Sequence, residues 1–169
     1  MITEPRIEER DELNYVAIRT VVSMDEIAKV LPPLIPEVYN WLSEQEQAPA
    51  GPLFFRYLRL DEGRRLDVEV AVPVRNPLQA DGRVESGRLP AGRYAVARHQ
   101  GSYDGLRDAW PAFERWCTRE GLQEAEDVLP DGTVRGTRAE HYLKGPADLP
   151  DPEQWETELV LQVREGTSK

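Results

Sequence analysis

Hydrophobic residues along the chain follow two kinds of pattern, one typical of strands and one of helices. Residues 13–22 and 92–99 are rich in Val, Ile, Tyr and Ala, so both are predicted to be strands. Between residues 106 and 117 the apolar side chains recur at helical spacing, and Gly121 offers a stop. Residues 34–42 show the same spacing. Each of the two strands is therefore predicted to precede a helix.

Prolines interrupt both predicted helices. Pro32, Pro33 and Pro36 lie in the first, and Pro111 lies in the second. A proline deep in a straight helix costs roughly 3 kcal/mol. We therefore expect each helix to be kinked, or to begin as a short turn that restarts near its proline.

The segments after each helix have the pattern of a hairpin. In the first, LFFRYLRL and RLDVEVAV flank an Asp- and Gly-containing turn at residues 61–64. In the second, the connection between residues 144 and 156 is longer and contains three prolines. Residues 73–89, with Pro, Asn, Asp and Gly, are predicted to link the two halves.

These elements form one unit that occurs twice in the same order. The matches are YVAIR (15–19) with YAVAR (94–98), IPEVYNWL (35–42) with WPAFERWC (110–117), RYLR (56–59) with HYLK (141–144), and DVEVAVPV (67–74) with ETELVLQV (156–163). We predict a single domain, 1–169, with repeat units at about 6–75 and 85–165. Two pseudo-symmetric strand–helix–strand–strand units predict an α+β fold, an antiparallel sheet with helices on one face and a central groove on the other.

Alternation along the strands identifies the side chains expected in that groove. In residues 156–163 the apolar side chains form the face that should meet the helix. In residues 137–144 the small and apolar Ala139 and Leu143 suit the helix side. Glu140 and Tyr142 are therefore predicted to face the groove.

The repeat adds further candidates for the groove. It places Phe55 and Tyr57 at the positions equivalent to Glu140 and Tyr142, so the groove would hold rings from both halves and an acid from one. Trp110, which precedes Pro111, is a further candidate. Clefts between halves of a protein are common ligand sites.

An acid among aromatic rings has three possible roles. A carboxylate without water there is unfavourable when ionised and alone, so a cationic ligand would restore the balance, and the rings would add cation–π attraction. The same acid could act as a general acid or base. Alternatively, Glu140 is a solvated strand residue paired with Arg138 or Lys144.

The composition indicates which classes of partner the protein is not expected to bind. The net charge of −10 argues against a nucleic-acid surface, which requires clustered Lys and Arg. No apolar run approaches the roughly 20 residues of a membrane span, and the acidic N-terminus does not resemble a signal peptide. We therefore expect a cytoplasmic bacterial-type protein that contacts neither nucleic acid nor membrane directly.

Metal and cofactor sites are not predicted. Cys117 is the single cysteine and lies in a helical pattern, so it is interpreted as a small buried hydrophobic residue. His99 and His141 are the two histidines, and their placement supports no metal site. We interpret His99 as structural, and we predict no cofactor.

The chain resembles a known family. The unit YAVARHQGSYDGLRDAWPAFERWC, the segment EHYLKGP and the closing WETELVLQV are similar to the GyrI-like small-molecule-binding domain, the effector-binding domain of bacterial regulators. The marks are His99, Gly101 and Tyr103 in the turn, and Glu140 and Tyr142 in the strand. The likeness spans nearly the whole chain and implies a groove glutamate, here Glu140 with Tyr142 beside it, that recognises cationic, often aromatic, compounds.

The resemblance leaves three functions open. The leading hypothesis is a stand-alone protein that binds a small cationic or aromatic compound. An enzyme is the second, because some family members are thought to hydrolyse reactive cyclopropane-bearing compounds; Glu140 and Tyr142 would then be catalytic. The third is a modulator that binds a protein such as DNA gyrase. We expect no helix-turn-helix segment, so the chain is not predicted to be a complete regulator.

Overall fold

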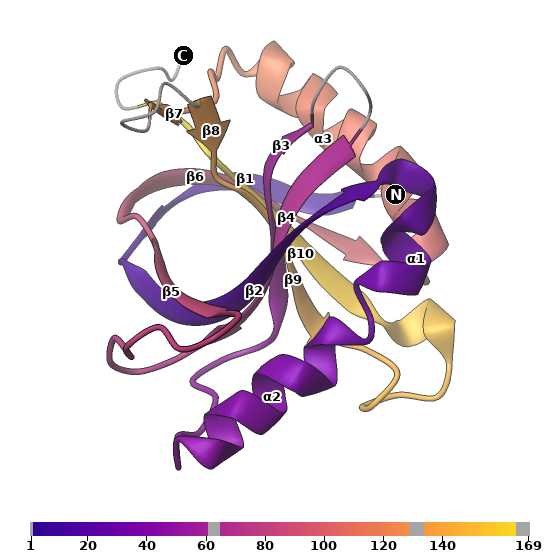
Figure 1. Cartoon of the computed structure of the whole chain (residues 1–169). Coiled ribbons are helices and arrows are strands. Elements are labelled where there is room, and N and C mark those ends of the chain that lie inside the picture. Colours follow the sequence, from indigo (N-terminus) through magenta and orange to yellow (C-terminus); the bar gives the residue numbers. More distant parts are fainter. Residues whose placement is uncertain (1, 61–64, 129–133, 165–169) are drawn as a thin grey trace.

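The computed structural model describes residues 2–60, 65–128 and 134–164. In chain order its elements are β1 (Ile2–Arg10), β2 (Leu13–Ser23), α1 (Ile27–Val30), α2 (Leu34–Glu44), β3 (Phe54–Leu60), β4 (Arg65–Pro73), β5 (Val84–Leu89), β6 (Gly92–Gln100), α3 (Leu106–Arg119), β7 (Glu126–Val128), β8 (Val134–Gly136), β9 (Arg138–Lys144) and β10 (Glu156–Gln162) (Figure 1). Short 3-10 turns lie at Met24–Glu26, Tyr103–Gly105 and Pro152–Gln154. The turn predicted at residues 61–64 lies outside the described residues.

Eight of the strands form one antiparallel sheet in the order β1-β6-β10-β9-β3-β4-β2-β5. The first repeat unit supplies β2, α1, α2, β3 and β4, and the second supplies β6, α3, β9 and β10. The two units meet where β3 pairs with β9. The predicted α+β fold with two strand–helix–strand–strand units is therefore confirmed.

Each of the two outermost strands pairs with a strand of the other repeat unit. β1 is followed in the chain by β2 but pairs with β6, whereas β5 is followed by β6 but pairs with β2. Neither strand was expected, and residues 73–89 are therefore not only a link. Their sequences, ITEPRIEER and VESGRL, contain few of the residues typical of strands, because an edge strand with one exposed face tolerates charged side chains.

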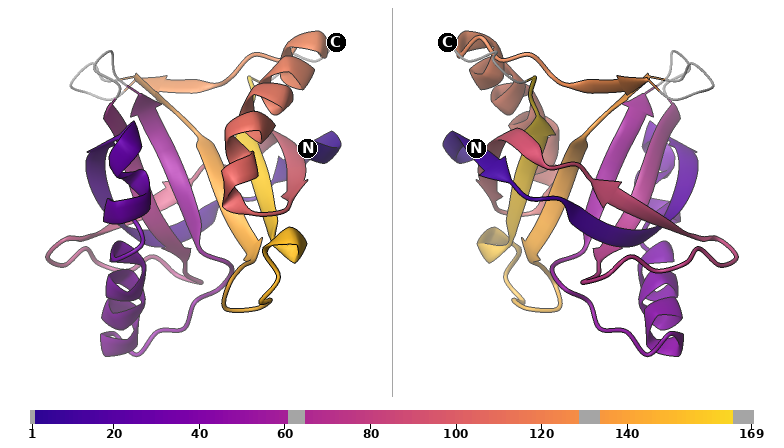
Figure 2. Two further views of the ribbon diagram at one scale, coloured as in Figure 1. Left: turned by 90° about the vertical axis from the view of Figure 1, so that its right-hand side faces the viewer. Right: turned by 90° about the vertical axis from the view of Figure 1, so that its left-hand side faces the viewer.

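The helices lie over separate halves of one face of the sheet (Figure 2). α2 buries Leu34, Val38 and Leu42 against the first unit, and α3 buries Phe113 and Cys117 against the second. The first helix is divided as its prolines predict: α1 ends at Val30, and α2 restarts at Leu34. α3 contains Pro111 and follows the 3-10 turn at Tyr103–Gly105.

The helix-free face of the sheet is concave. It has its own core, in which residues from distant strands meet, including Tyr15, Phe54, Leu89, Tyr94 and Val96. β5 and β6 are separated by five strands in the sheet order, and yet Leu89 and Tyr94 belong to the same cluster. In Figure 1 the outer strands correspondingly curl around this side, away from the helices.

The side on which the predicted groove residues lie differs from the prediction. Glu140 pairs with Leu159, which packs under α3, and with Phe55, which packs against the core under α2. Side chains of directly paired residues point to the same face of a sheet. Glu140, Tyr142 and Tyr57 therefore lie on the helix-bearing face, while Ala139 belongs to the concave face. The small size of Ala139 does not identify the helix-bearing face, because the crowded concave face also requires small side chains.

Candidate functional site

A buried carboxylate lies between the helix-covered halves of the sheet. Glu140 is on β9 and only 5% exposed. Its Oε1 accepts hydrogen bonds from the hydroxyls of Tyr57 (2.7 Å) and Tyr142 (2.6 Å). Its Oε2 accepts one from Nε1 of Trp110 (2.6 Å). We call these four residues the Glu140 site.

Three different elements supply the donors, and each position follows from local structure. Tyr142 is two residues beyond Glu140 on β9, so both side chains point to one face. Tyr57 comes from β3, which pairs with β9 and crosses the seam between the units. Trp110 projects from α3, whose apolar side packs on β10 and β6. The acid is thus held by both units and by a helix.

The donors to Glu140 are all neutral. Among the described residues we find no ion pair to this carboxylate. The guanidinium of Arg138 lies 5.4 Å from the ring centroid of Trp110. Arg138 is itself paired with Glu114 and Glu124. Within the described part of the chain, the carboxylate therefore has hydrogen bonds but no ion-pair partner.

Burial and the neighbouring carboxylate also affect the tyrosines. Burial raises the pKa of Tyr57 and of Tyr142 well above the ordinary value of 10.0, and the negative charge of Glu140 raises both further. Both hydroxyls therefore stay protonated at neutral pH. They act as donors to the acid rather than as competing anions.

Aromatic rings connect the acid to the surface. The ring centroid of Tyr142 lies 5.0 Å from that of Phe55 and 5.4 Å from that of Tyr103. Tyr103 is 36% exposed and lies 4.8 Å from Trp155, again between ring centroids. Tyr142, Tyr103 and Trp155 thus form a continuous row of rings, which we call the aromatic row.

The structure brings together all five residues predicted for the site. Glu140, Tyr142, Tyr57 and Trp110 are in direct hydrogen-bonded contact, and Phe55 packs against Tyr142. Whether each contacts a ligand stays a prediction.

Sequence reasoning assigned no role to Tyr103 or Trp155. The signal for Tyr103 was its place in the HQGSY turn. Trp155 could have been noticed as an aromatic residue between a proline-rich connection and a strand.

His99 and Cys117, the other candidate reactive residues, make contacts that stabilise the fold. Nε2 of His99 lies 3.0 Å from the carbonyl oxygen of Ser102, and its ring packs so closely on Gly105 that an added Cβ would approach within 2.6 Å. Cys117 is buried, and burial raises the pKa of its thiol to about 11. In the described ranges no group of three or more His, Cys, Asp or Glu residues is placed to hold a metal ion.

The fold and the site define a class of protein: a two-unit α+β domain with a buried acid and aromatic rings at the seam. The chain belongs to the GyrI-like family, since the model of the GyrI-like small molecule binding domain matches residues 3–164. No curated protein sequence matches the chain.

Several solved structures share the fold. The C-terminal domain of EcmrR superposes with a TM-score of 0.73 at 20% identity, covering 95% of this chain and 97% of that one. EcmrR in its DNA complex gives 0.77 at 21% identity, and the match covers 95% of this chain but 57% of that one. SAV2435 bound to tetraphenylphosphonium gives 0.61 at 12% identity, covering 96% and 95%. A hydrolase encoded by lin2189 from Listeria innocua gives 0.63 at 16% identity, covering 95% and 92%.

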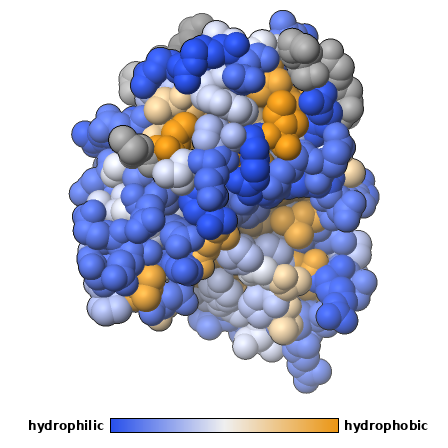
Figure 3. Space-filling model, turned by 180° about the vertical axis from the view of Figure 1, so that it is seen from behind, coloured by the Kyte–Doolittle hydropathy of each residue, from blue (hydrophilic) through white to orange (hydrophobic). Residues whose placement is uncertain are grey.

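Within the described ranges, no helix combines the length and the apolar character needed to cross a bilayer. Seen from behind, the molecule is largely hydrophilic, with hydrophobic patches that are small and separate (Figure 3).

Proposed function

We propose that this protein binds small cationic compounds with aromatic groups, and that Glu140 is the group that recognises the cation. The observation that carries the proposal is the buried carboxylate of Glu140, which has three neutral donors and, among the described residues, no ion-pair partner. A buried anion in an enclosed aromatic setting interacts strongly with a cation, because little water screens the attraction. The fold shared with SAV2435, which was solved with tetraphenylphosphonium, agrees with this ligand class.

The aromatic row provides the route and the second contact. Glu140 is 5% exposed, so a ligand reaches it only when an aromatic neighbour moves. Tyr103 is the exposed end of the row and Trp155 lies against it. Their faces suit a planar or multi-ring cation, and each such contact contributes roughly 0.5–2 kcal/mol.

Binding of tetraphenylphosphonium and of the neutral triphenylphosphine oxide, measured by calorimetry, tests the proposal. Glu140→Gln should weaken binding of the cation about tenfold, because the Coulombic attraction between the carboxylate and the cation is lost, and a loss of about 1.4 kcal/mol corresponds to a factor of ten. Binding of the neutral compound should change little.

Glu69→Gln is the matched control. Glu69 is also 5% exposed and accepts a hydrogen bond from a tyrosine, Tyr15, but lies with the concave-face residues. It should leave cation binding unchanged. Equal loss of the two compounds in Glu140→Gln, or equal loss in both variants, would refute a recognition role for Glu140.

Hydrolysis is a second candidate function at the same site. The observation in its favour is that two tyrosine hydroxyls meet one carboxylate oxygen of Glu140, which brings proton donors and a base together. In this scheme Glu140 removes a proton from water as the water attacks, and a tyrosine hydroxyl donates to the leaving oxygen. Loss of a reactive test compound over time at substoichiometric protein, absent in Glu140→Gln, separates turnover from binding.

A further inference from the structure

Arg138 lies beside the Glu140 site, on the same strand and the same face of the sheet. It is two residues before Glu140 on β9, and it pairs with Leu161, which packs under α3. The indole of Trp110 contacts both side chains. The guanidinium carbon of Arg138 lies 5.4 Å from the centroid of the Trp110 ring, and Nε1 of Trp110 donates to Oε2 of Glu140 at 2.6 Å. One side chain of α3 is therefore in contact with two side chains of one strand.

The guanidinium of Arg138 is itself held at all three nitrogens. Nη1 donates to Glu114 at 2.6 Å, and Nε and Nη2 donate to the two carboxylate oxygens of Glu124 at 3.2 and 3.1 Å. Paired bonds of this kind between a guanidinium and a carboxylate fix the plane of the guanidinium as well as its position. The Trp110 ring therefore lies against a cation whose orientation is already set.

Glu114 connects this arrangement to the helix that carries Trp110. Glu114 follows Trp110 by four residues on α3, so both side chains lie on the same side of the helix. Arg138 bonds the carboxylate of one and contacts the ring of the other. A rotation of the Trp110 side chain would therefore lose the contact with Arg138 and the hydrogen bond to Glu140 together.

The contribution of Arg138 to the site is orientation rather than charge. Its guanidinium forms ion pairs with the carboxylates of both Glu114 and Glu124, so this group of three side chains has a net negative charge. It therefore does not act as a countercharge for Glu140.

We propose that Arg138 is a positioning residue of the Glu140 site: it holds the Trp110 indole so that the Nε1–H points at Oε2 of Glu140. The inference rests on the proposed function, in which Glu140 recognises the cation. A carboxylate that is already oriented binds a cation more tightly than one that must be ordered on binding.

The indole N–H signal of Trp110 in nitrogen–proton NMR spectra tests the positioning without any ligand. Trp110→Phe assigns the signal, because one of the four indole signals disappears. Arg138→Met should move this signal towards that of an indole in water and speed its exchange with solvent. Glu114→Gln should move it less and in the same direction. Because Glu114 is exposed, this second variant keeps the test decisive if Arg138→Met does not fold.

Arg98→Met is the matched control. Arg98 is also an ion-paired strand residue, with a side chain that is 37% exposed against 31% for Arg138, but it follows Ala97 of the α3 core and so points to the concave face. This variant should leave the Trp110 signal where it is in the wild type. Equal movement in Arg98→Met and Arg138→Met would overturn the proposal, because the effect would then be a general loosening of the sheet.

Calorimetry with tetraphenylphosphonium measures whether Arg138 acts through Trp110. Arg138→Met should weaken binding about fivefold, the value of one hydrogen bond, in the otherwise wild-type protein. In a Trp110→Phe background, which lacks the N–H, the same change should have no further effect. Full additivity of the two changes would overturn the proposal.

The two hypotheses fail in different ways. If Glu140→Gln binds the cation as tightly as the wild type, the proposed function is wrong, and the ligand-free Trp110 signal still decides the role of Arg138. If Glu140→Gln weakens binding but Arg138→Met leaves both the Trp110 signal and the affinity unchanged, the proposed function stands and the positioning role is refuted.

Discussion

At the scale of the residue, strand alternation places two consecutive residues of β9 in different surroundings. Glu140 and His141 are both buried, but they lie on opposite faces. Glu140 has three hydrogen-bond donors, whereas Nε2 of His141 has no partner among the described residues. One face of β9 therefore holds a hydrogen-bonded carboxyl group, and the other face holds an imidazole that burial keeps neutral at pH 7.

The neutral state of His141 makes stability depend on pH. Burial lowers its pKa from 6.5 to about 4 in the folded protein, with Glu158 opposing and Arg10 reinforcing the shift. The unfolded chain therefore binds more protons below pH 6.5, and the contribution is complete above 6.5 and lost as the pH falls towards 4. We expect the unfolding free energy of the wild type to fall between pH 6.5 and 4 by up to about 3 kcal/mol more than that of His141→Leu. Urea denaturation across this range measures the difference, and parallel curves would contradict it.

Tyr103 is predicted to contribute through its ring. It is the exposed member of the aromatic row, 5.4 Å from Tyr142 between ring centroids. Tyr103→Leu should weaken tetraphenylphosphonium binding about five- to tenfold, because one cation–π contact is lost. Tyr103→Phe keeps the ring and is the control that should bind as the wild type does. Similar affinities for the Leu and Phe variants, measured by calorimetry, would count against the ring contact.

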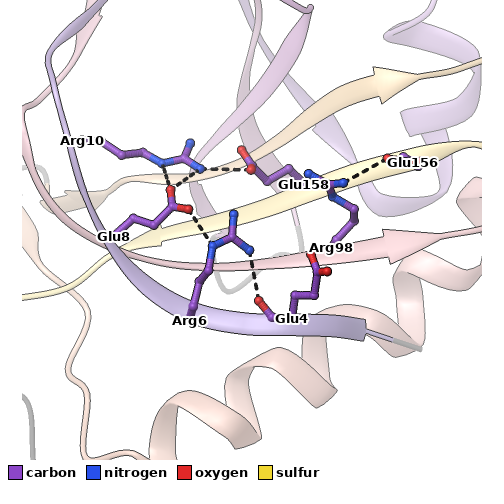
Figure 4. Close-up of polar contacts among 7 residues, drawn as sticks. All are labelled: Glu4, Arg6, Glu8, Arg10, Arg98, Glu156 and Glu158. Carbon is purple, nitrogen blue, oxygen red and sulfur yellow. Dashed lines mark hydrogen bonds and ion pairs between the residues drawn. The ribbon is translucent and has the colours of Figure 1, made fainter.

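At the scale of the element, β1 is an edge strand held in part by charge. Its Arg6, Glu8 and Arg10 side chains alternate in sign and join Glu158 of β10 through ion pairs (Figure 4). Glu8 lies between the two arginines, and their hydrogen bonds and charges lower its pKa in spite of the opposing effect of burial. Arg10, the last residue of β1, also lines a small cavity on the concave face.

Reversal of the charge at Glu8 should loosen β1. In Glu8→Lys, three positive side chains would lie together on one strand, and we expect the edge to be destabilised by about 1 kcal/mol. Hydrogen exchange of the β1 and β6 amides should accelerate, with the β3–β4 amides unaffected. Glu9→Lys changes the next residue, which is exposed and points to the other face, and should have a smaller effect. Equal acceleration in both variants would mean that the network does not hold the strand.

At the scale of the whole molecule, a buried polar chain joins the two repeat units. Arg56 is 1% exposed and donates from Nη1 to the hydroxyl of Tyr15 at 2.9 Å and from Nη2 to Oγ1 of Thr137 at 2.9 Å. Tyr15 in turn donates to Glu69. Arg56 thus connects a carboxylate of the first unit to a side chain of the second.

Loss of the Arg56 guanidinium should destabilise the fold as a whole. Arg56→Met removes the buried guanidinium that is linked to the Glu69 carboxylate through Tyr15, which costs about 3 kcal/mol. Thr137→Val removes one hydrogen bond and should cost about 1 kcal/mol. Chemical denaturation should show a single transition shifted by these amounts. A double variant, Arg56→Met with Glu69→Leu, should recover part of the loss, and failure to do so would show that the charge is not the cause.

The sequence by itself determined the repeat, the helices and the inner strands. Apolar spacing and the matched segments are local properties, and the core positions they predict, such as Val38 and Phe113, are buried. The five candidate residues also came together, because strand alternation and the repeat place rings at equivalent positions on β3 and β9.

Tertiary structure alone decided the side of the sheet and the exchange of the edge strands. The face of Glu140 follows from its register with Leu159 and Phe55, and no feature within residues 137–144 encodes that pairing. β1 and β5 pair with strands of the other unit, so their partners lie far away in the chain. The local spacing of apolar residues predicts which residues are buried, whereas pairing between distant strands determines which buried residues are in contact.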